Sequence, residues 1–360
     1  MLQLGVPLRS ESDYMTPYFI ILFSILLWLN LEKYLLNRKA FWIPLGVLSI
    51  FAGIRSNKVG TDSGAYTSTF QSNLHPDYYE FNPDVEVGYQ YFEYLLLNFT
   101  HQYYWLFLIT SFLICFCYLN IIKRFSHDYI FSIFLFITLG LYTFFFNGLR
   151  QGVAMAIFAL SLPYLLERRF ILYFLICIFA SFVHTSALFM IPFYFLVNIR
   201  IKLIYKIATV FLFSIISSRL IIQYFAESNK RYESYAEFSD ESGGLFVLIF
   251  YLILLIFIYM IKKLYNINDI TFQKIFEFYA LGIALLIPVA MLGTAASGPQ
   301  RLLSYFTWVL LLILPYVFLK INNKIIKYIF SILMIVFFYL TTSRFSNLTP
   351  YILNPVFEIF

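Results

Sequence analysis

Four short polar clusters interrupt an otherwise apolar sequence, and they carry side chains that bind phosphate or transfer protons. Within residues 53–66, 147–151, 183–186 and 298–301, the candidates are Arg55, Lys58, Asp62, Arg150, Gln151, His184 and Arg301. Arginine suits phosphate because its planar guanidinium can donate two parallel hydrogen bonds to phosphate oxygens. A neutral histidine or a carboxylate can take a proton from a hydroxyl. The clusters therefore favour group transfer on a phosphorylated substrate.

Each cluster also has an ordinary structural explanation. An arginine near a membrane boundary often reaches lipid headgroups, and Arg55, Arg150 and Arg301 could do only that. Asp62 could cap a short helix, and His184 could cap or pack at a helix break. The repeated placement of such clusters at one predicted membrane boundary favours a common site.

The composition excludes a water-soluble globule. The chain has 360 residues, of which 61% are hydrophobic and only 12% are charged, whereas soluble domains have about 25% charged residues. Such high hydrophobicity also excludes an intrinsically disordered chain. The formal net charge of +6 indicates basic cytoplasmic loops rather than nucleic-acid binding.

The histidines and cysteines predict neither a metal site nor a disulfide framework. His75, His101 and His127 lack partners at the spacing of metal ligands. The three cysteines lie in apolar runs and show no CxxC spacing. No Walker loop and no GxGxxG turn occurs in the sequence. We therefore expect neither a metal nor a cofactor.

Apolar segments predict an all-α polytopic membrane protein with about twelve membrane-spanning helices. A spanning helix needs about 20 mostly apolar residues, and the candidate segments are 17–33, 41–54, 103–122, 129–146, 149–166, 170–184, 186–198, 203–222, 245–261, 274–293, 302–319 and 325–343. Segments 41–54, 170–184 and 186–198 are short for a full crossing, so they are expected either to be extended by flanking polar residues or to be partly re-entrant. The whole chain, 1–360, is expected to form a single integral membrane domain.

Basic residues predict the orientation in the membrane. Sixteen of the 25 Lys and Arg residues fall in one set of alternating loops, and 14 of the 19 acidic residues fall in the other set. Basic loops stay cytoplasmic by the positive-inside rule, so both termini are expected on the extracytoplasmic side. The long polar loops 55–102 and 223–244 then lie outside. Within the first loop, residues 89–99 are expected to form an amphipathic helix on the membrane surface.

Three predicted helices begin at the outer boundary, beside three of the polar clusters. Segments 149–166, 186–198 and 302–319 all run from outside to inside in this topology. A helix N-terminus carries unpaired N–H groups and about half a positive charge, and it binds anions. Arg150 and Arg301 lie at two of these helix starts. Together these features predict a site suited to a diphosphate at the outer boundary.

The same residues resemble the EpsG family of Wzy-type bacterial polysaccharide polymerases. The matching segments occur in the family's order, and they cover nearly the whole chain. They are Gly53-Ile54-Arg55, Val59-Gly60-Thr61-Asp62 with Tyr66, Glu86-Val87-Gly88-Tyr89, Leu149-Arg150-Gln151-Gly152-Val153-Ala154, Phe182-Val183-His184-Thr185-Ser186-Ala187, Arg301 with Tyr305-Phe306, and Pro350-Tyr351.

The resemblance implies a glycosyltransferase-type polymerase of O-antigen, capsule or exopolysaccharide in the bacterial cytoplasmic membrane. The implied fold is a GT-C-like helical bundle with extracytoplasmic loops. The donor would be a growing glycan on undecaprenyl diphosphate, and the acceptor would be the terminal hydroxyl of one lipid-linked repeat unit. The reaction is expected to need no metal and no nucleotide sugar. The implied partners are the lipid-linked repeat units, membrane lipid and a co-polymerase that controls chain length, with no nucleic acid.

Within that reaction the polar clusters receive expected roles. The set expected to hold the donor diphosphate is Arg150, Arg301 and Gln151, supported by Arg55 or Lys58. Either His184 or Asp62 is expected to deprotonate or orient the acceptor hydroxyl, and the sequence leaves this choice open. Fixed cations and helix starts would stabilise the negative charge that develops on the leaving diphosphate.

Two other functions fit the same helices or the same donor. A lipid-linked oligosaccharide flippase or transporter would also fit twelve spans, but transporters usually carry polar residues near the bilayer midplane and show internal repeats. Here the polar clusters gather at one predicted face, and no repeat is found. An O-antigen ligase would use the same donor but attach the polymer to lipid A–core. A polymerase is therefore the favoured interpretation.

Overall fold

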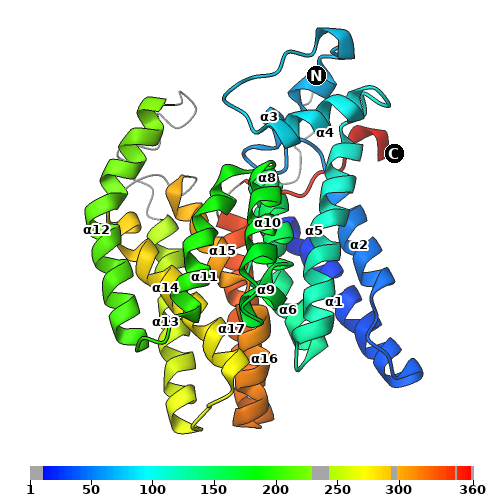
Figure 1. Cartoon of the computed structure of the whole chain (residues 1–360). Helices are drawn as coiled ribbons and strands as arrows, with labels where there is room; N and C mark the ends of the chain where they lie inside the picture. Colours follow the sequence, from blue (N-terminus) through cyan, green and yellow to red (C-terminus); the bar gives the residue numbers. More distant parts are fainter. Residues whose placement is uncertain (1–10, 229–242, 293–297, 345–346, 358–360) are drawn as a thin grey trace.

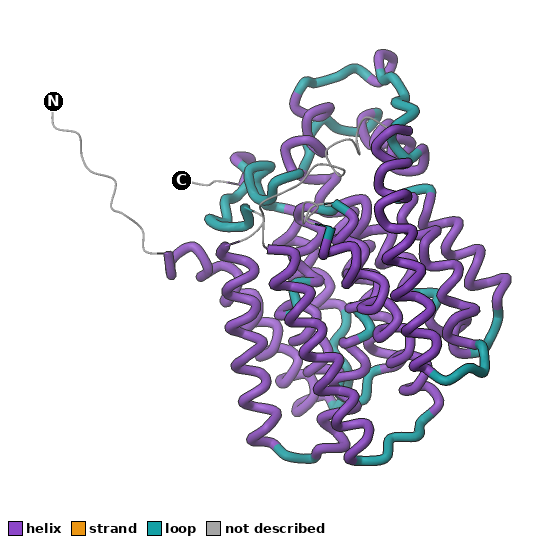
Figure 2. The backbone as a smooth tube through the Cα atoms, turned by 90° about the vertical axis from the view of Figure 1, so that its left-hand side faces the viewer, coloured by secondary structure: helices purple, strands orange, loops and turns teal. Residues whose placement is uncertain are grey.

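The structure, a computed structural model, is a bundle of helices. It describes residues 11–228, 243–292, 298–344 and 347–357. Within these ranges the chain is helix, turn and loop, and extended pairing is limited to one β-bridge between Arg55 and Leu353. Figure 2 shows the long helices lying side by side. The predicted all-α class is confirmed.

The helices follow the predicted apolar segments, several of them in two pieces. The α-helices are α1 Glu11–Leu36, α2 Trp42–Gly53, α3 Ser63–Gln71, α4 Val87–Leu97, α5 Tyr104–Phe125, α6 Tyr129–Thr138, α7 Leu141–Asn147, α8 Leu149–Ala159, α9 Leu162–Leu166, α10 Phe170–Ser181, α11 Ile191–Asn198, α12 Leu203–Ser228, α13 Gly243–Leu264, α14 Ile270–Met291, α15 Ser304–Thr307, α16 Leu310–Ile321 and α17 Lys324–Arg344. Short 3₁₀ helices are η1 Pro76–Tyr78, η2 Thr185–Met190, η4 Pro299–Leu303 and η5 Pro355–Phe357.

Counted by the length of its helices, the structure supports fewer membrane crossings than the twelve that the sequence predicts. Among the described residues, seven helical stretches are long and apolar enough to cross, and an eighth forms if Pro299–Thr307 and Leu310–Ile321, bent by 43°, act as one span. The 12-residue helices α2 and α10 each rise about 18 Å. A hydrocarbon core is about 30 Å thick, so neither crosses it alone. The structure thus supports a polytopic membrane protein without confirming twelve crossings.

The outer helices are apolar on both of their sides, as a lipid-facing bundle requires. The exposed side of α1 carries Ile20, Phe23, Leu27 and Leu31. Its buried side carries Tyr18, Leu22, Ile25 and Leu29. A helix of a soluble protein would expose polar residues on the outward side. This pattern confirms that the protein belongs in a membrane.

Residues 55–102 form a cap over one end of the bundle, and this cap contains α3 and α4 (Figure 1). Helix α4 coincides with the predicted amphipathic segment 89–99, shifted by two residues. It buries Tyr89, Glu93 and Leu97 and exposes Val87, Tyr91 and Leu95, and Phe99 just beyond its end is also exposed. An apolar exposed side is compatible with contact to lipid, and its location on the membrane surface stays a prediction. Of the second predicted loop, 223–244, residues 229–242 lie outside the described residues.

The C-terminal segment, residues 347–357, crosses the loop that leads from α2 into the cap. The backbone N–H of Ser56 donates to the carbonyl of Ile352 at 2.8 Å, and the N–H of Gly60 donates to the carbonyl of Asn347 at 2.8 Å. The Tyr18 hydroxyl of α1 donates to the carbonyl of Leu348 at 2.6 Å. The beginning of α1 and the C-terminal segment therefore lie at the same end of the bundle as the cap.

A close helix contact behind the site generates a test of the packing. A Cβ atom added at Gly282 of α14 would lie 2.0 Å from Cγ of Phe306 in α15. Overpacking of this kind costs about 1–3 kcal/mol, so we expect Gly282→Ala to lower the unfolding temperature of the protein in detergent.

The control is Gly46→Ala in α2, where no atom lies within 4 Å of an added Cβ. Alanine also favours a helix over glycine by about 1 kcal/mol, so this variant should match or exceed the wild-type unfolding temperature. Equal unfolding temperatures for the two variants would contradict the packing described.

Candidate functional site

The three helix starts that the sequence singled out lie together beneath the cap. The side-chain amide of Gln151, at the beginning of α8, donates to the carbonyl of Arg301 in η4 at 3.1 Å. The hydroxyls of Ser186 in η2 and Tyr305 in α15 lie 3.0 Å apart. The start of α8 is thus bonded to η4, and the start of η2 is bonded to α15, which follows η4 directly.

A buried ion pair connects the cap to this group of helix starts. Nη1 of Arg150 lies 2.8 Å from Oε2 of Glu86, and the two side chains are only 4% and 5% exposed. The second carboxylate oxygen, Oε1, accepts a hydrogen bond from the backbone N–H of Thr185 at 3.2 Å. It also lies 3.9 Å from Nδ1 of His184. Glu86 therefore holds the starts of α8 and η2 at once.

Glu86 is absent from the residues that the sequence nominated, although it begins one of the family-like segments. It lies in the long polar loop, 64 positions from Arg150, so nothing local indicates a partner. The available signal was an acidic residue directly before an apolar helix, at the predicted outer boundary. Glu86 adds a carboxylate to the candidate site.

Aromatic rings enclose the Arg150 guanidinium on its cap side. Its Cζ lies 5.3 Å from the ring centre of Tyr89 and 5.9 Å from that of Tyr66. Both distances fall within the range of cation–π attraction. Arg150 is thus turned toward the cap, with little of its surface open to a ligand.

A second and more open ion pair joins Asp62 of the cap to Arg301. Nη2 of Arg301 lies 2.9 Å from Oδ2 of Asp62, and the side chains are 20% and 34% exposed. Asp62 precedes α3 at the capping position, but its side chain makes no capping hydrogen bond. The hydroxyl of Thr61 donates to Oδ1 of Asp62 at 3.2 Å. Asp62 and Arg301 thus meet at an accessible position.

The loop before Asp62 is fixed against the end of α7. The side-chain oxygen of Asn147 accepts from the backbone N–H of Thr61 at 2.6 Å and from its hydroxyl at 3.2 Å. Gly60 has a positive φ of 100°, and an added Cβ would lie 2.7 Å from that Asn147 oxygen. Glycine is therefore required here for both conformation and space. These contacts place Asp62 opposite Arg301.

His184 caps the start of η2 and is held as a neutral ring with a defined tautomer. Its Nδ1 accepts from the backbone N–H of Ser186 at 3.2 Å and lies 2.7 Å from the Ser186 hydroxyl. A backbone N–H can only donate, so the proton of the neutral ring sits on Nε2. Burial lowers the pKa of His184 to about 4, and the charges of Arg150 and Arg301 act in the same direction against the pull of Glu86.

Arg55 lies in a separate, closed environment. Its guanidinium is sandwiched between the rings of Phe107 and Phe146, with Cζ 3.7 Å and 4.3 Å from the ring centres. It donates to the carbonyl of Ala52, and burial lowers the pKa of Arg55 to about 10. Its side chain is fully buried, so no contact brings Arg55 to the donor position that the sequence analysis expected it to support.

Lys58 lies on the surface of the same loop. Its side chain is exposed, and its backbone carbonyl accepts from the Asn347 side chain at 3.4 Å. The structure thus leaves Lys58 accessible at the edge of the cap, and its expected support of a diphosphate stays a prediction.

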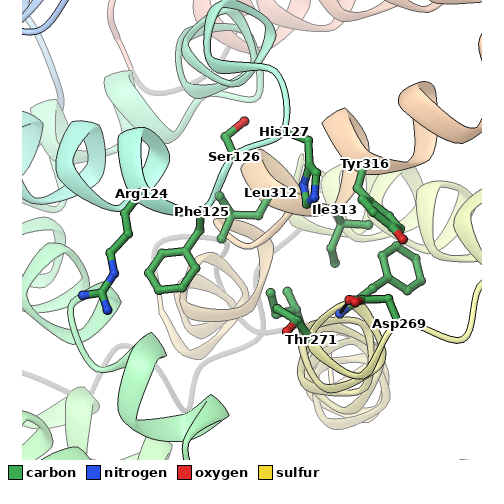
Figure 3. Close-up of a pocket in the computed structure, with 11 residues that line it drawn as sticks. Arg124, Phe125, Ser126, His127, Asp269, Thr271, Leu312, Ile313 and Tyr316 are labelled. Carbon is green, nitrogen blue, oxygen red and sulfur yellow. Dashed lines mark hydrogen bonds between the residues drawn. The ribbon is translucent and has the colours of Figure 1, made fainter. Parts of the chain in front are cut away.

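No described group of three His, Cys, Asp or Glu residues is arranged to hold a metal ion. A cavity of about 330 Å³ lies far from the cap, where the loops after α5 and α13 meet α16 (Figure 3). Its polar lining includes Arg124, His127, Asp269 and Tyr316. None of the nominated site residues lines this cavity.

Fold and site together define a polytopic helical membrane protein in which two arginine–carboxylate pairs and a histidine meet at one end, beneath a cap. The model of the EpsG family matches residues 38–353, a range that contains every nominated site residue. The chain therefore belongs to the EpsG family, and this membership supports a role of the polysaccharide-polymerase type. A search of curated proteins found no match, and a search of solved structures found none.

The low pKa of His184 generates a prediction about stability. The pKa is about 4 in the folded protein, against an ordinary value of 6.5, so the unfolded chain takes up this proton first as the pH falls. The stability linked to His184 is complete above pH 6.5 and is lost progressively toward pH 4. We expect the unfolding temperature of the wild type to fall more between pH 7 and pH 4.5 than that of His184→Gln.

His75→Gln serves as the control because the His75 side chain is exposed, and it should follow the wild type. If wild type and His184→Gln lose the same stability over this pH range, His184 is not held neutral by burial.

Proposed function

We propose that the protein extends a bacterial surface polysaccharide by transferring a growing glycan from undecaprenyl diphosphate to a lipid-linked repeat unit. The acceptor is the terminal hydroxyl of that unit, and the reaction takes place at the outer face of the cytoplasmic membrane. One observation carries the proposal in this EpsG-family chain: two arginine–carboxylate pairs and a neutral histidine gather where three helix starts meet.

The chemistry needs a stabilised leaving group and a proton acceptor. The acceptor hydroxyl oxygen attacks the anomeric carbon, and the bond from that carbon to the diphosphate oxygen breaks. The electron pair leaves with undecaprenyl diphosphate, and the hydroxyl proton passes to a base of the protein. Arg301 and the nearby helix starts stabilise the charge on the departing diphosphate.

The tautomer of His184 bears on the choice between the two candidate bases, His184 and Asp62. Its Nδ1 is engaged by Ser186, so Nε2 carries a proton and can donate but not accept. His184 then serves as a hydrogen-bond donor to a sugar or phosphate oxygen. This arrangement supports Asp62 as the group that accepts the proton.

The two arginines differ in how they can contribute. Arg150 is buried and already paired with Glu86, which supports a positioning role that keeps the cap on the bundle. Arg301 is the more exposed arginine and supplies the principal contact to the donor diphosphate. The side-chain amide of Gln151 supports Arg301 by donating a hydrogen bond to the Arg301 backbone carbonyl.

The position of the charges supports an enzyme over a transporter. The ion pairs lie between the cap and the ends of the bundle helices, whereas transport sites lie near the midplane of the membrane. The reaction proposed here uses the protein's own cations and requires neither a metal ion nor a cofactor.

The principal test uses purified protein in lipid vesicles with defined undecaprenyl-diphosphate-linked repeat units, scored for a ladder of longer glycans. Wild type should form the ladder. Arg301→Gln should reduce the rate about a hundredfold or more, the usual effect of removing one donor to a developing charge.

Arg219→Gln is the matched control, since Arg219 is an exposed arginine on α12, and it should keep the wild-type rate. A flippase would produce no ladder, and a ligase would need an added lipid A–core acceptor. Either result would overturn the proposal, as would an unchanged rate in Arg301→Gln.

Chelation tests the expected independence from metals. We expect EDTA to leave the ladder unchanged, because protein cations and helix starts supply the stabilisation. Loss of the ladder in EDTA, followed by recovery with one added divalent ion, would contradict this expectation.

A further inference from the structure

We infer that Asp62 and the donor diphosphate compete for Arg301, so that donor binding releases the Asp62 carboxylate to act as the base. The inference rests on the proposed function and specifies how its site is switched on. It concerns the Asp62–Arg301 pair alone and leaves the Glu86–Arg150 pair intact during the reaction.

The two ion pairs differ in their access to a ligand. The Glu86 and Arg150 side chains are 5% and 4% exposed, whereas those of Asp62 and Arg301 are 34% and 20% exposed. Separating a buried pair strands an uncompensated charge away from water, while an exposed pair separates at little cost. An arriving anion therefore exchanges with Asp62 and not with Glu86.

The contacts of each partner show which one can move. The backbone of Arg301 is tied to Gln151 through a hydrogen bond of 3.1 Å. The Asp62 carboxylate makes no capping bond to α3. Among the described residues, its hydrogen bonds come from Arg301 and from the Thr61 hydroxyl. The Asp62 carboxylate can therefore turn away from Arg301 by side-chain rotation, while Gln151 holds the Arg301 backbone in place.

A diphosphate is the stronger partner for Arg301. It offers several charged oxygens to the planar guanidinium and can accept two hydrogen bonds at once. In the pair with Asp62, the structure shows a single contact, from Nη2 to Oδ2 at 2.9 Å.

The exchange couples substrate binding to catalysis. While Asp62 is paired with Arg301, the guanidinium occupies Oδ2 of the carboxylate and competes with any hydroxyl for it. Once the diphosphate holds Arg301, the carboxylate is free to accept the proton of the acceptor hydroxyl. That oxygen then bonds to the anomeric carbon, the bond to the diphosphate breaks, and the electron pair leaves with the diphosphate. A base that is released only by the donor avoids activating a hydroxyl or water when no donor is bound.

The experiment separates binding from turnover in Asp62→Asn. Binding is measured with farnesyl diphosphate, a short polyprenyl diphosphate, in detergent-solubilised protein, and turnover is measured by ladder formation. Removing the competing charge should tighten farnesyl diphosphate binding about two- to fivefold. This factor corresponds to the typical contribution of an exposed ion pair. Turnover should fall about a hundredfold or more, as expected for loss of a general base.

Two further variants complete the design. Asp77→Asn removes an exposed carboxylate elsewhere in the cap and should leave both binding and turnover unchanged. Asp62→Glu keeps the carboxylate and should recover part of the turnover, whereas a purely structural role for Asp62 would weaken binding in Asp62→Asn.

Weaker or unchanged farnesyl diphosphate binding in Asp62→Asn would overturn the inference, as would equal tightening in Asp77→Asn. Wild-type ladder formation decides the proposed function separately. If the wild type forms a ladder and Asp62→Asn binds no tighter, the polymerase proposal stands and the competition for Arg301 is wrong.

Discussion

The buried ion pair between Glu86 and Arg150 is the constraint on which the rest of the site depends. It joins the cap to the start of α8, and the second oxygen of Glu86 reaches the start of η2. Loss of one partner of such a pair costs about 3–5 kcal/mol because the other charge stays buried and uncompensated. Native proteins are stable by about 5–15 kcal/mol, so this pair contributes a large share of the stability that keeps the cap over the helix starts.

The closed cap creates a site in which charges are paired but unequally accessible. Glu86 neutralises Arg150 away from water, and Asp62 neutralises Arg301 at a partly open position. Between them His184 contributes a neutral donor, because burial keeps its pKa low and Ser186 occupies Nδ1. The site therefore offers an anion one exchangeable cation, Arg301, and one neutral N–H donor, His184, instead of a bare cluster of positive charge.

The sequence predicted the helical class and the neighbourhood of several site residues, because both depend on local pattern. Apolar runs located the helices, and the family-like segments pointed to Asp62, Arg150, His184 and Arg301. Glu86 was missed because its role arises from tertiary contacts across the cap. Arg55 was expected beside the donor, yet it stacks between Phe107 and Phe146, and local sequence does not reveal which way a loop side chain turns. The count of twelve crossings was not confirmed because short helices such as α10 are apolar without being long enough.

The C-terminal segment crosses the loop before Asp62, and this crossing has a consequence for biosynthesis. Asn347 and Lys58, which meet there, are 289 positions apart in the chain, so the ribosome supplies one side of this contact long after the other. The loop of Asp62 cannot reach its final conformation until those late residues have been synthesised and folded back against it. A chain interrupted in α17 would carry Asp62, Arg150 and Arg301 and still lack the segment that packs against the Asp62 loop, which ties completion of the site to completion of synthesis.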